Sequence, residues 1–450
     1  TTTYSKLTFE YHHMEEFRRG GDLLNRPPHE ANVAEQTEHS INGGGLKFDY
    51  FSPNENHRFN VFASAQHINR DSYYGPGDRD PLDAYGNTTD LNWMAGSQYV
   101  YSFGKCIFMP SDLTAGIEFN QDKLEDNMWG YNRTVDQKVN IGSAFLQNEW
   151  KNDHWGFLIG GRLDKHNLID HVIFSPRANL RYNPTENINL RFSYSSGFRA
   201  PQAFDEDLHV ENVGGNVAMV ELADNLKEER SQSLSASADI YHRFGAFQVN
   251  FLVEGFYTKL SDVFALTDGE VVDGILTRTR HNASGAQVLG LTLEGKMAYL
   301  NKIQVQAGVT LQQSHYSKPH IWNKEAPAVK KMMRTPNTYG YFTATYTPIK
   351  PLSIALSGTY TGSMLVPHEP VPGFLENPIT VNTKDFFDIG LKAAYDFKLY
   401  KSMNLQLNAG IQNIFNAYQD DFDKGADRDS GYIYGPSLPR SFFAGVKISY

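Results

Sequence analysis

The chain has 450 residues, and its 41 Lys and Arg side chains against 51 Asp and Glu side chains give a formal net charge of −10. This acidic balance, without any basic block, argues against a nucleic-acid-binding protein. Cys106 is the single cysteine, which excludes an internal disulfide framework and a cysteine-rich metal site.

Apolar and polar residues alternate with a period of two in segment after segment, which is the pattern of β-strands. In chain order, clear apolar sets are Phe59/Val61/Ala63/Ala65, Leu113/Ala115/Ile117/Phe119, Ile188/Leu190/Phe192/Tyr194, Phe247/Val249/Phe251/Val253, Leu289/Leu291/Leu293 and Ile303/Val305/Ala307/Val309/Leu311. We count about eighteen such strands, each near or above the roughly 9–11 residues that a tilted membrane strand needs. The sequence therefore predicts an all-β fold.

The polar face of these strands distinguishes a membrane barrel from a soluble sheet. Gln304, Gln306, Thr310 and Gln312 alternate with the apolar residues of the strand from Ile303, and Gln, Asn, Ser, Thr and Gly dominate this face elsewhere. A solvated exterior would be rich in Lys and Glu, whereas this composition suits a wet lumen. No apolar run approaches the roughly 20 residues of a membrane-spanning helix. We therefore predict a transmembrane antiparallel β-barrel over residues 1–450; a soluble all-β adhesin is the alternative.

The predicted connections alternate between short and long. Short links are expected at 52–56, 152–153, 184–187, 244–245, 300–302, 348–351 and 401–402, and long polar links at 17–37, 72–89, 199–228, 317–337, 362–384 and 418–439. Transmembrane barrels show this asymmetry, with tight periplasmic turns and extended outer loops. Two links depart from it: 166–171 is short where a long loop is expected, and 103–112 is overlong for a tight turn.

The two chain ends fix the expected direction of the strands. Phe442, Ala444, Val446, Ile448 and Tyr450 form a last alternating strand, and the first strand, near residues 5–16, then runs toward the outer side. The first residues lack the charged-then-apolar order of a secretory leader, so we expect the natural chain to extend upstream.

Four segments resemble the TonB-dependent receptor family of Gram-negative outer membranes. They are Phe174-Ser175-Pro176-Arg177 with Asn179-Leu180-Arg181-Tyr182, Gly197-Phe198-Arg199-Ala200-Pro201-Gln202, Asn225-Leu226-Lys227 with Glu229, and Asn413-Ile414-Phe415-Asn416 with Pro439-Arg440. The third segment lacks the prolines of the family motif. The amino-acid sequences of 198–209 and 424–439 are similar to those of receptors from the Bacteroidetes. The resemblance also gives the aromatic final residue the role of a barrel-assembly signal.

The resemblance implies a barrel of about 22 strands with a plugged lumen, so about four strands and the plug are expected upstream of this chain. It further implies active import of a scarce nutrient across the bacterial outer membrane, with a metal chelate such as an iron siderophore, haem or cobalamin as the leading cargo. A glycan or peptide importer, a passive porin and a barrel hydrolase are the alternatives. The implied partners are outer-membrane lipid, a TonB-type energy-coupling protein acting through the plug, the chelate itself and a surface lipoprotein.

Several residues of the expected outer loops are candidate ligand contacts. His209 lies where haem receptors of this family place a ligating His, and an imidazole can bind haem iron axially. Arg199 belongs to the rim motif, although it can equally pair with Asp205 or Glu206. Aromatic rings at Tyr73, Tyr74, Trp322, Tyr432 and Tyr434 could stack on a planar ligand, or anchor the barrel at the headgroups.

One loop has the composition of a calcium site. Asp421, Asp423, Asp427 and Asp429 alternate between turn-forming glycines, as carboxylates do in oxygen-rich calcium loops. The loop lacks the Glu of an EF-hand, and Lys424 and Arg428 could simply neutralise it. No cofactor is otherwise required. No nucleophile with a paired base, phosphate-cradling loop or zinc spacing is found, so the sequence predicts a protein that is not an enzyme.

Overall fold

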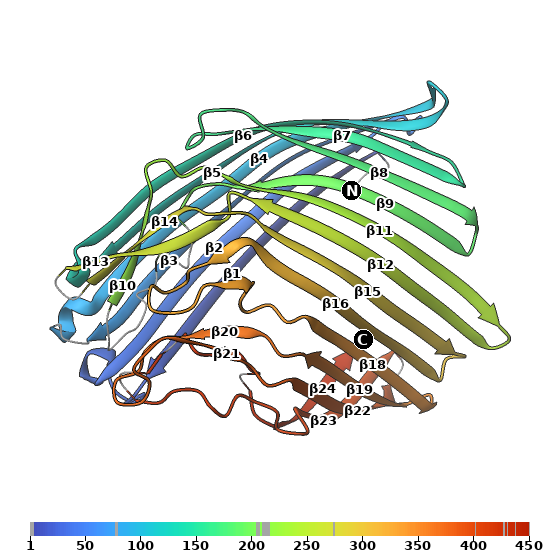
Figure 1. Ribbon diagram of the computed structural model, residues 1–450. Helices are drawn as coiled ribbons and strands as arrows, with labels where there is room; N and C mark the ends of the chain where they lie inside the picture. The colour runs from blue at the N-terminus through green and yellow to red at the C-terminus, as the bar shows by residue number, and fades with distance from the viewer. Residues whose placement is uncertain are drawn as a thin grey trace.

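The computed structural model of the chain is a curved wall of antiparallel strands that follow one another in chain order around the molecule (Figure 1). It describes residues 4–76, 80–203, 208, 217–272, 275–400, 402–425, 428–429, 431–436 and 438–449. The main sheet has nineteen strands, of which β17 has only three residues. The other eighteen build the wall, as the alternation predicts.

The wall strands fall into a first set of long strands and a second set of shorter ones. The first set comprises β1 (Ser5–Gly21), β2 (Val33–Phe51), β3 (His57–Pro76), β4 (Tyr85–Cys106), β5 (Met109–Met128) and β6 (Arg133–Lys151). The second comprises β7 (Trp155–His166), β8 (Ile173–Thr185), β9 (Ile188–Arg199), β11 (Glu229–Phe244), β12 (Phe247–Ser261), β15 (Ala286–Tyr299), β16 (Ile303–His320), β18 (Thr338–Ile349), β19 (Leu352–Thr361), β22 (Phe386–Tyr400), β23 (Met403–Gln412) and β24 (Ser441–Ser449).

The two faces of the wall differ as the alternation requires. Phe192 on β9 is directly opposite Leu180 on β8 and Ala236 on β11, so the three side chains share the outer face. Phe192 is 48% exposed, as is normal for a side chain that meets lipid instead of a protein core. Arg191 is opposite Arg181 and Ser237 on the inner face. The strands therefore bury little against one another, and the ladder hydrogen bonds hold the wall together.

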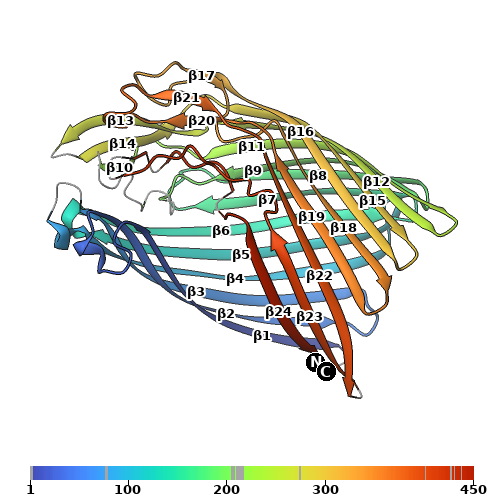
Figure 2. The same ribbon diagram turned by 90° about the horizontal axis from the view of Figure 1, so that it is seen from below.

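The two ends of the wall have different connections, and Figures 1 and 2 show them at opposite ends of the molecule. Tight turns follow β2, β4, β6, β8, β11, β15, β18 and β22, and most of the other links are long. The prediction that 103–112 forms an overlong turn is wrong. β4 and β5 remain paired as far as Cys106 and Met109, so only two residues turn the chain. Ile107 there adopts a left-handed conformation with a φ of 65°.

The strands of the first set reach further outward than the sequence predicts. Residues 17–21 and 33–37 belong to β1 and β2 and not to a loop, and residues 72–76 extend β3. The tip of this part of the wall has its own small core of Val33, Tyr74, Met128, Tyr131 and Met219. Beyond the lipid layer no face needs to be apolar throughout, so alternation fades although the strands continue.

Small elements fill the long connections at the outer end. They are β10 (Val217–Leu222), β13 (Phe264–Val272) and β14 (Ile275–Asn282), which form a three-stranded sheet; β20 (Leu365–His368) with β21 (Ile379–Asn382); β17 (Val329–Lys331); and the 3-10 turns η1 (Pro28–Glu30), η2 (Pro81–Ala84) and η3 (Trp129–Tyr131). Figure 2 shows the small sheets gathered at this end. Among the described helices, none has the length and hydropathy to cross a membrane.

Candidate functional site

Tyr73 and Tyr74 lie at the outer end of β3, and both are almost fully buried. Tyr73 packs with Ala31, Ala34 and Ala84, and Tyr74 belongs to the small core that includes Met219 of β10. The hydroxyl of Tyr131 donates a hydrogen bond to the backbone carbonyl of Tyr74. Both tyrosines therefore stiffen the tip of the wall, and neither ring is accessible to a ligand in this conformation.

Tyr432 and Tyr434 lie in the link between β23 and β24, where both hydroxyls donate hydrogen bonds to Asp421, at 3.1 and 2.6 Å. Burial and the nearby carboxylate raise the pKa of Tyr432 to about 12, and they also raise the pKa of Tyr434. Both hydroxyls thus stay protonated as donors. The Tyr432 ring stacks on His368 with the centroids 3.8 Å apart, which ties this link to β20.

The carboxylates of the predicted calcium loop have protein partners. Asp423 pairs with His368 at 2.9 Å and accepts a hydrogen bond from the backbone N–H of Asp429, while Asp429 accepts from the backbone N–H groups of Glu369 and Gly431. Within the described ranges, no group of three or more His, Cys, Asp and Glu side chains is placed to hold a metal ion. Asp427 lies outside the described residues, so calcium binding stays a prediction.

His209 also lies outside the described residues, together with Asp205 and Glu206, and haem ligation at His209 therefore stays a prediction. Arg199 lies at the end of β9, where its Nη1 is 4.0 Å from Oε2 of Glu229. Its guanidinium also lies over the ring of Phe264, 5.8 Å from the centroid. Arg199 therefore points toward the β13–β14 hairpin.

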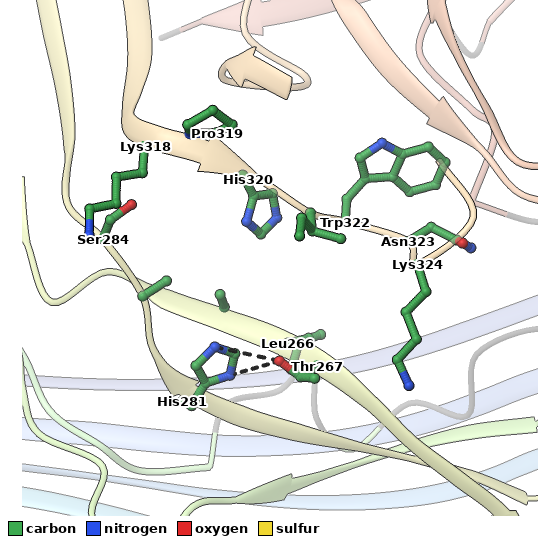
Figure 3. Close-up of a pocket in the computed structure, with 13 residues that line it drawn as sticks. Leu266, Thr267, His281, Ser284, Lys318, Pro319, His320, Trp322, Asn323 and Lys324 are labelled. Atoms are coloured by element: carbon green, nitrogen blue, oxygen red, sulfur yellow. Dashed lines mark hydrogen bonds between the residues drawn. The ribbon is translucent and has the colours of Figure 1, made fainter. Parts of the chain in front are cut away.

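Trp322 lines a pair of adjoining cavities at the mouth of the barrel, which we call the mouth cleft. One cavity has a volume of about 560 Å³ and the other about 400 Å³, and they share Ala265, Leu266, Ala283, Ser284, His320 and Trp322. Figure 3 shows His320 extending from the end of β16 toward His281 and Thr267 of the β13–β14 hairpin. The buried indole N–H of Trp322 has no hydrogen-bond acceptor within the part of the chain that the structure describes.

The second cavity of the mouth cleft brings arginines together with aromatic rings. Arg199, Arg278 and Arg280 line it with Phe264, Tyr316 and Trp322. Arg280 is only 5% exposed, and its guanidinium lies 6.0 Å from the centroid of Phe264. Arg278 approaches Glu369 at 4.0 Å. A guanidinium presents a planar set of N–H donors, which suits recognition of anionic oxygen atoms.

The described lining of the mouth cleft is mainly cationic, in a chain whose net charge is −10. Its described lining has five cationic side chains, Arg199, Arg278, Arg280, Lys318 and Lys324, and one carboxylate, Glu369. Partly enclosed walls concentrate such a field and raise the local concentration of anions. The cleft is therefore equipped to attract and hold a ligand that carries negative charge and planar groups.

The sequence alone identified Arg199 and Trp322 but missed the other residues of the cleft. Arg278 and Arg280 alternate with Thr277 and Thr279 before His281 on β14, a short basic stripe that resembles no family motif. This stripe, inside a chain that is otherwise acidic, is the signal that could have revealed the cleft. His320 could not be found in this way, because a lone His at a strand end is usually solvated.

Comparison with known proteins identifies the fold. The family model described as TonB dependent receptor-like, beta-barrel matches residues 3–414. The siderophore receptor PirA from Acinetobacter baumannii superimposes with a TM-score of 0.68 at 13% identity, over 99% of this chain and 68% of that one. The ferric-catecholate import receptor Fiu from E. coli K12 gives 0.69 at 14%, over 99% and 72%.

A third solved structure is a ferric enterobactin receptor mutant of Pseudomonas aeruginosa in complex with enterobactin, with a TM-score of 0.71 at 15% identity, over 99% of this chain and 68% of that one. No curated protein sequence matches the chain. Because the family model covers most of the chain and the wall is the expected antiparallel barrel, the chain belongs to the TonB-dependent receptor family of outer-membrane β-barrels.

Proposed function

We propose that this chain is the barrel of an active importer whose mouth cleft captures an anionic iron chelate. The observation that carries the proposal is the charge of the cleft: five cationic side chains and one carboxylate among its described lining residues. The aromatic rings of Tyr316 and Trp322 offer faces for stacking, and the indole N–H of Trp322, which has no acceptor among the described residues, offers a donor.

Iron is favoured over the other cargoes by the solved receptors of the same fold. The names of PirA, Fiu and the Pseudomonas receptor refer to a siderophore, a ferric catecholate and ferric enterobactin. A ferric complex of catecholates is multiply anionic and aromatic, and these are the two properties that the cleft favours. A neutral glycan would not need the arginines. Haem or cobalamin would use the same aromatic faces but fewer of the cations.

The wall is a sheet of strands, and we propose that the energy for import comes from outside it. We propose that a TonB-type protein supplies it by acting on a plug inside the lumen, since a barrel of about 22 strands without a plug would leak. A passive porin is the competing function. A surface lipoprotein partner and a role for outer-loop calcium remain predictions that rest on the sequence.

Binding to the full-length receptor tests this function. The receptor in detergent is titrated with a ferric tris-catecholate and, separately, with a neutral ferric hydroxamate. We expect the anionic chelate to bind at least tenfold more tightly than the neutral one. The variant Arg278→Gln/Arg280→Gln should bind the anionic chelate about 10- to 100-fold more weakly, because each guanidinium makes a charge-assisted hydrogen bond. Equal affinity for both chelates would reject an anionic cargo.

The control for this titration is Arg243→Gln. Arg243 lies near the tight turn between β11 and β12, at the opposite end of the wall from the cleft. The change removes one charge, against two in the cleft variant, from the same residue type, and it should leave the affinity for the anionic chelate unchanged. A similar loss in both variants would show that the total charge of the receptor, and not the cleft, decides binding.

A further inference from the structure

A polar row crosses the outer face of the wall just beyond its apolar band. The register places Gln232 of β11 opposite Lys259 of β12, Lys259 opposite Gln287 of β15, Gln287 opposite His315 of β16, and His315 opposite Lys331 of β17. Directly opposite residues of neighbouring strands point to the same face. These five residues, the rim row, therefore form one continuous line of side chains across five strands.

The rim row is on the lipid-facing side of the wall and not in the lumen. On the same face, two positions further along each strand toward the tight turns, lie Leu234, Tyr257 and Leu289. Leu234 is 40% exposed and Leu289 is 56% exposed. The side chains of Gln232, Lys259 and Gln287 are exposed as well. The inner face at this level is occupied by residues such as Ser233 and Thr258, which bond to each other at 2.9 Å.

The height of the rim row corresponds to the headgroups of the outer leaflet. On β15 the apolar face runs from Leu289 to Tyr299, at the end with the tight turns. At a rise of about 3.4 Å per residue and a tilt of about 40°, this stretch spans about 26 Å, which is close to the roughly 25 Å apolar band of outer-membrane barrels. Gln287 and its neighbours in the row therefore lie where the hydrocarbon ends.

An aromatic residue marks the same boundary. Tyr257 lies on the apolar side of the row, and its hydroxyl points outward to Oε1 of Gln287 at 3.4 Å. Tyrosines at a membrane interface take this orientation, with the ring among acyl chains and the hydroxyl among headgroups. The position of Tyr257 thus supports the level inferred from the length of β15.

The chemistry of the rim row favours an anion. It has two lysines and one histidine but no carboxylate, in a chain whose net charge is −10. Within the part of the chain that the structure describes, neither Lys259 nor Lys331 forms an ion pair. Lysines at this level extend toward the headgroups, and the glutamine amides between them supply further hydrogen-bond donors. Ammonium groups and amide N–H donors, without a carboxylate in the row, suit the anionic oxygen atoms of phosphate groups.

From these observations we infer that the rim row is a binding site for the phosphate groups of outer-leaflet lipid headgroups. The site holds a lipid against the outside of the wall between β11 and β17. It is separate from the mouth cleft, which is lined by side chains of the β13–β14 hairpin, by Tyr316 and by residues 318–324. The inference therefore does not depend on the identity of the imported cargo.

Lipid retention by the full-length receptor tests the site. The receptor in a zwitterionic detergent is mixed with phosphatidic acid, whose headgroup is a phosphate monoester, or with phosphatidylcholine, and bound lipid is counted by native mass spectrometry. We expect selective retention of phosphatidic acid. The variant Lys259→Gln/Lys331→Gln should lose about thirtyfold in affinity for it, which corresponds to about 1 kcal/mol for each cation near a membrane surface.

The matched control is Lys302→Gln/Lys350→Gln, which removes two lysines from the tight turns after β15 and β18 at the other end of the wall. This control should bind phosphatidic acid within about twofold of the unaltered receptor, and both variants should keep the heat-modifiable gel migration of a folded barrel. The inference is overturned if the Lys259/Lys331 variant retains phosphatidic acid like the unaltered receptor, if the control loses as much, or if both lipids bind equally well.

Discussion

Arg199 and Arg280 share the ring of Phe264: their guanidinium carbons lie 5.8 and 6.0 Å from its centroid. Arg199 ends β9 and Arg280 belongs to β14, so one aromatic ring fixes cations from two separate outer segments. A cation–π contact contributes about 0.5–1 kcal/mol at an exposed site and about 2 kcal/mol where the cation is desolvated. The ring thus aligns two of the charges that we assign to chelate capture.

The variant Phe264→Leu tests this alignment, because leucine fills much of the space but offers no aromatic face. We expect the affinity for a ferric tris-catecholate to fall about fivefold, as both guanidinium groups lose their common support. Isothermal titration calorimetry on the full-length receptor measures the change. The control is Phe374→Leu, which removes a ring that is 77% exposed in the link between β19 and β22. Unchanged affinity in Phe264→Leu would show that the ring does not position the arginines.

The orientation of β9 can be tested with two neighbouring residues. Phe192→Arg places a charge on the lipid side and should cost on the order of 2–4 kcal/mol of barrel stability near mid-bilayer. Arg191→Gln alters the inner face, where Arg191 bonds to Asn189 at 2.7 Å, and should leave folding nearly intact. Urea-dependent folding into phosphatidylcholine vesicles measures both. Equal costs for the two changes would reject the assigned faces.

The sequence predicts the wall of the barrel well because lipid imposes a strict alternation on the residues it contacts. Strands such as β15 and β16 follow that alternation along the whole apolar band, so their two faces and their approximate ends can be predicted from the sequence. The outer ends of β1 to β6 cannot be predicted from the alternation. There Tyr73 and Tyr74 are consecutive residues of β3, and both are buried, in two different clusters. Such a pair breaks the alternation of apolar and polar residues.

The candidate site is less predictable, since its residues come together only in three dimensions. Trp322 was identified as one of several outer aromatic rings, but its partners His281 and His320 are 39 residues apart in the sequence, on β14 and β16. The hairpin that carries His281 and Arg280 never crosses the membrane, so lipid imposes no pattern on it. Tyr432 and Tyr434 were identified in the same way, yet their hydroxyls serve to hold Asp421.

A buried ion cluster stabilises the outer tip of the wall. Asp126 on β5 is fully buried and lies 3.6 Å from Arg70 and 3.3 Å from Arg133, and Thr88 donates a hydrogen bond to it at 2.6 Å. We expect Asp126→Asn to cost about 3–5 kcal/mol, because the change removes a buried carboxylate that lies beside two buried guanidinium groups. Urea unfolding in lipid vesicles measures the change.

The control for this cluster is Lys123→Gln, which breaks an exposed pair with Glu125 on the same strand. An exposed ion pair contributes about 0–1 kcal/mol, so the unfolding midpoint should barely move. If Asp126→Asn had no greater effect than this control, the buried cluster would not contribute to the stability of the tip.

The anchoring of the link between β9 and β11 should depend on pH through Glu228. Burial acts to raise the pKa of this carboxyl, but hydrogen bonds from Arg230, from a backbone N–H and from His171 outweigh it and lower the pKa below its usual value of 4.5. A carboxyl with a lowered folded pKa stabilises the fold above its unfolded pKa and loses this contribution as the pH falls through the folded pKa. We therefore expect the link to loosen only below about pH 4.5.

Hydrogen exchange of the backbone near Glu228, followed from pH 7 to pH 3 with correction for intrinsic rates, measures this loosening. Protection should be constant from pH 7 to about pH 5 and then fall. Glu228→Gln should remove that pH dependence. A loss of protection that began above pH 6, or that persisted in Glu228→Gln, would assign the transition to another group.

Uptake by intact cells tests the central claim most directly, because it requires both the cleft and an energy source. Cells that depend on the full-length receptor are supplied with a radiolabelled ferric tris-catecholate below saturation, with and without a protonophore. We predict energy-dependent uptake that stops with the protonophore and falls at least tenfold in Arg278→Gln/Arg280→Gln, but not in Arg243→Gln. Uptake that continued without a proton-motive force, or that was indifferent to the two cleft arginines, would contradict active import through the mouth cleft.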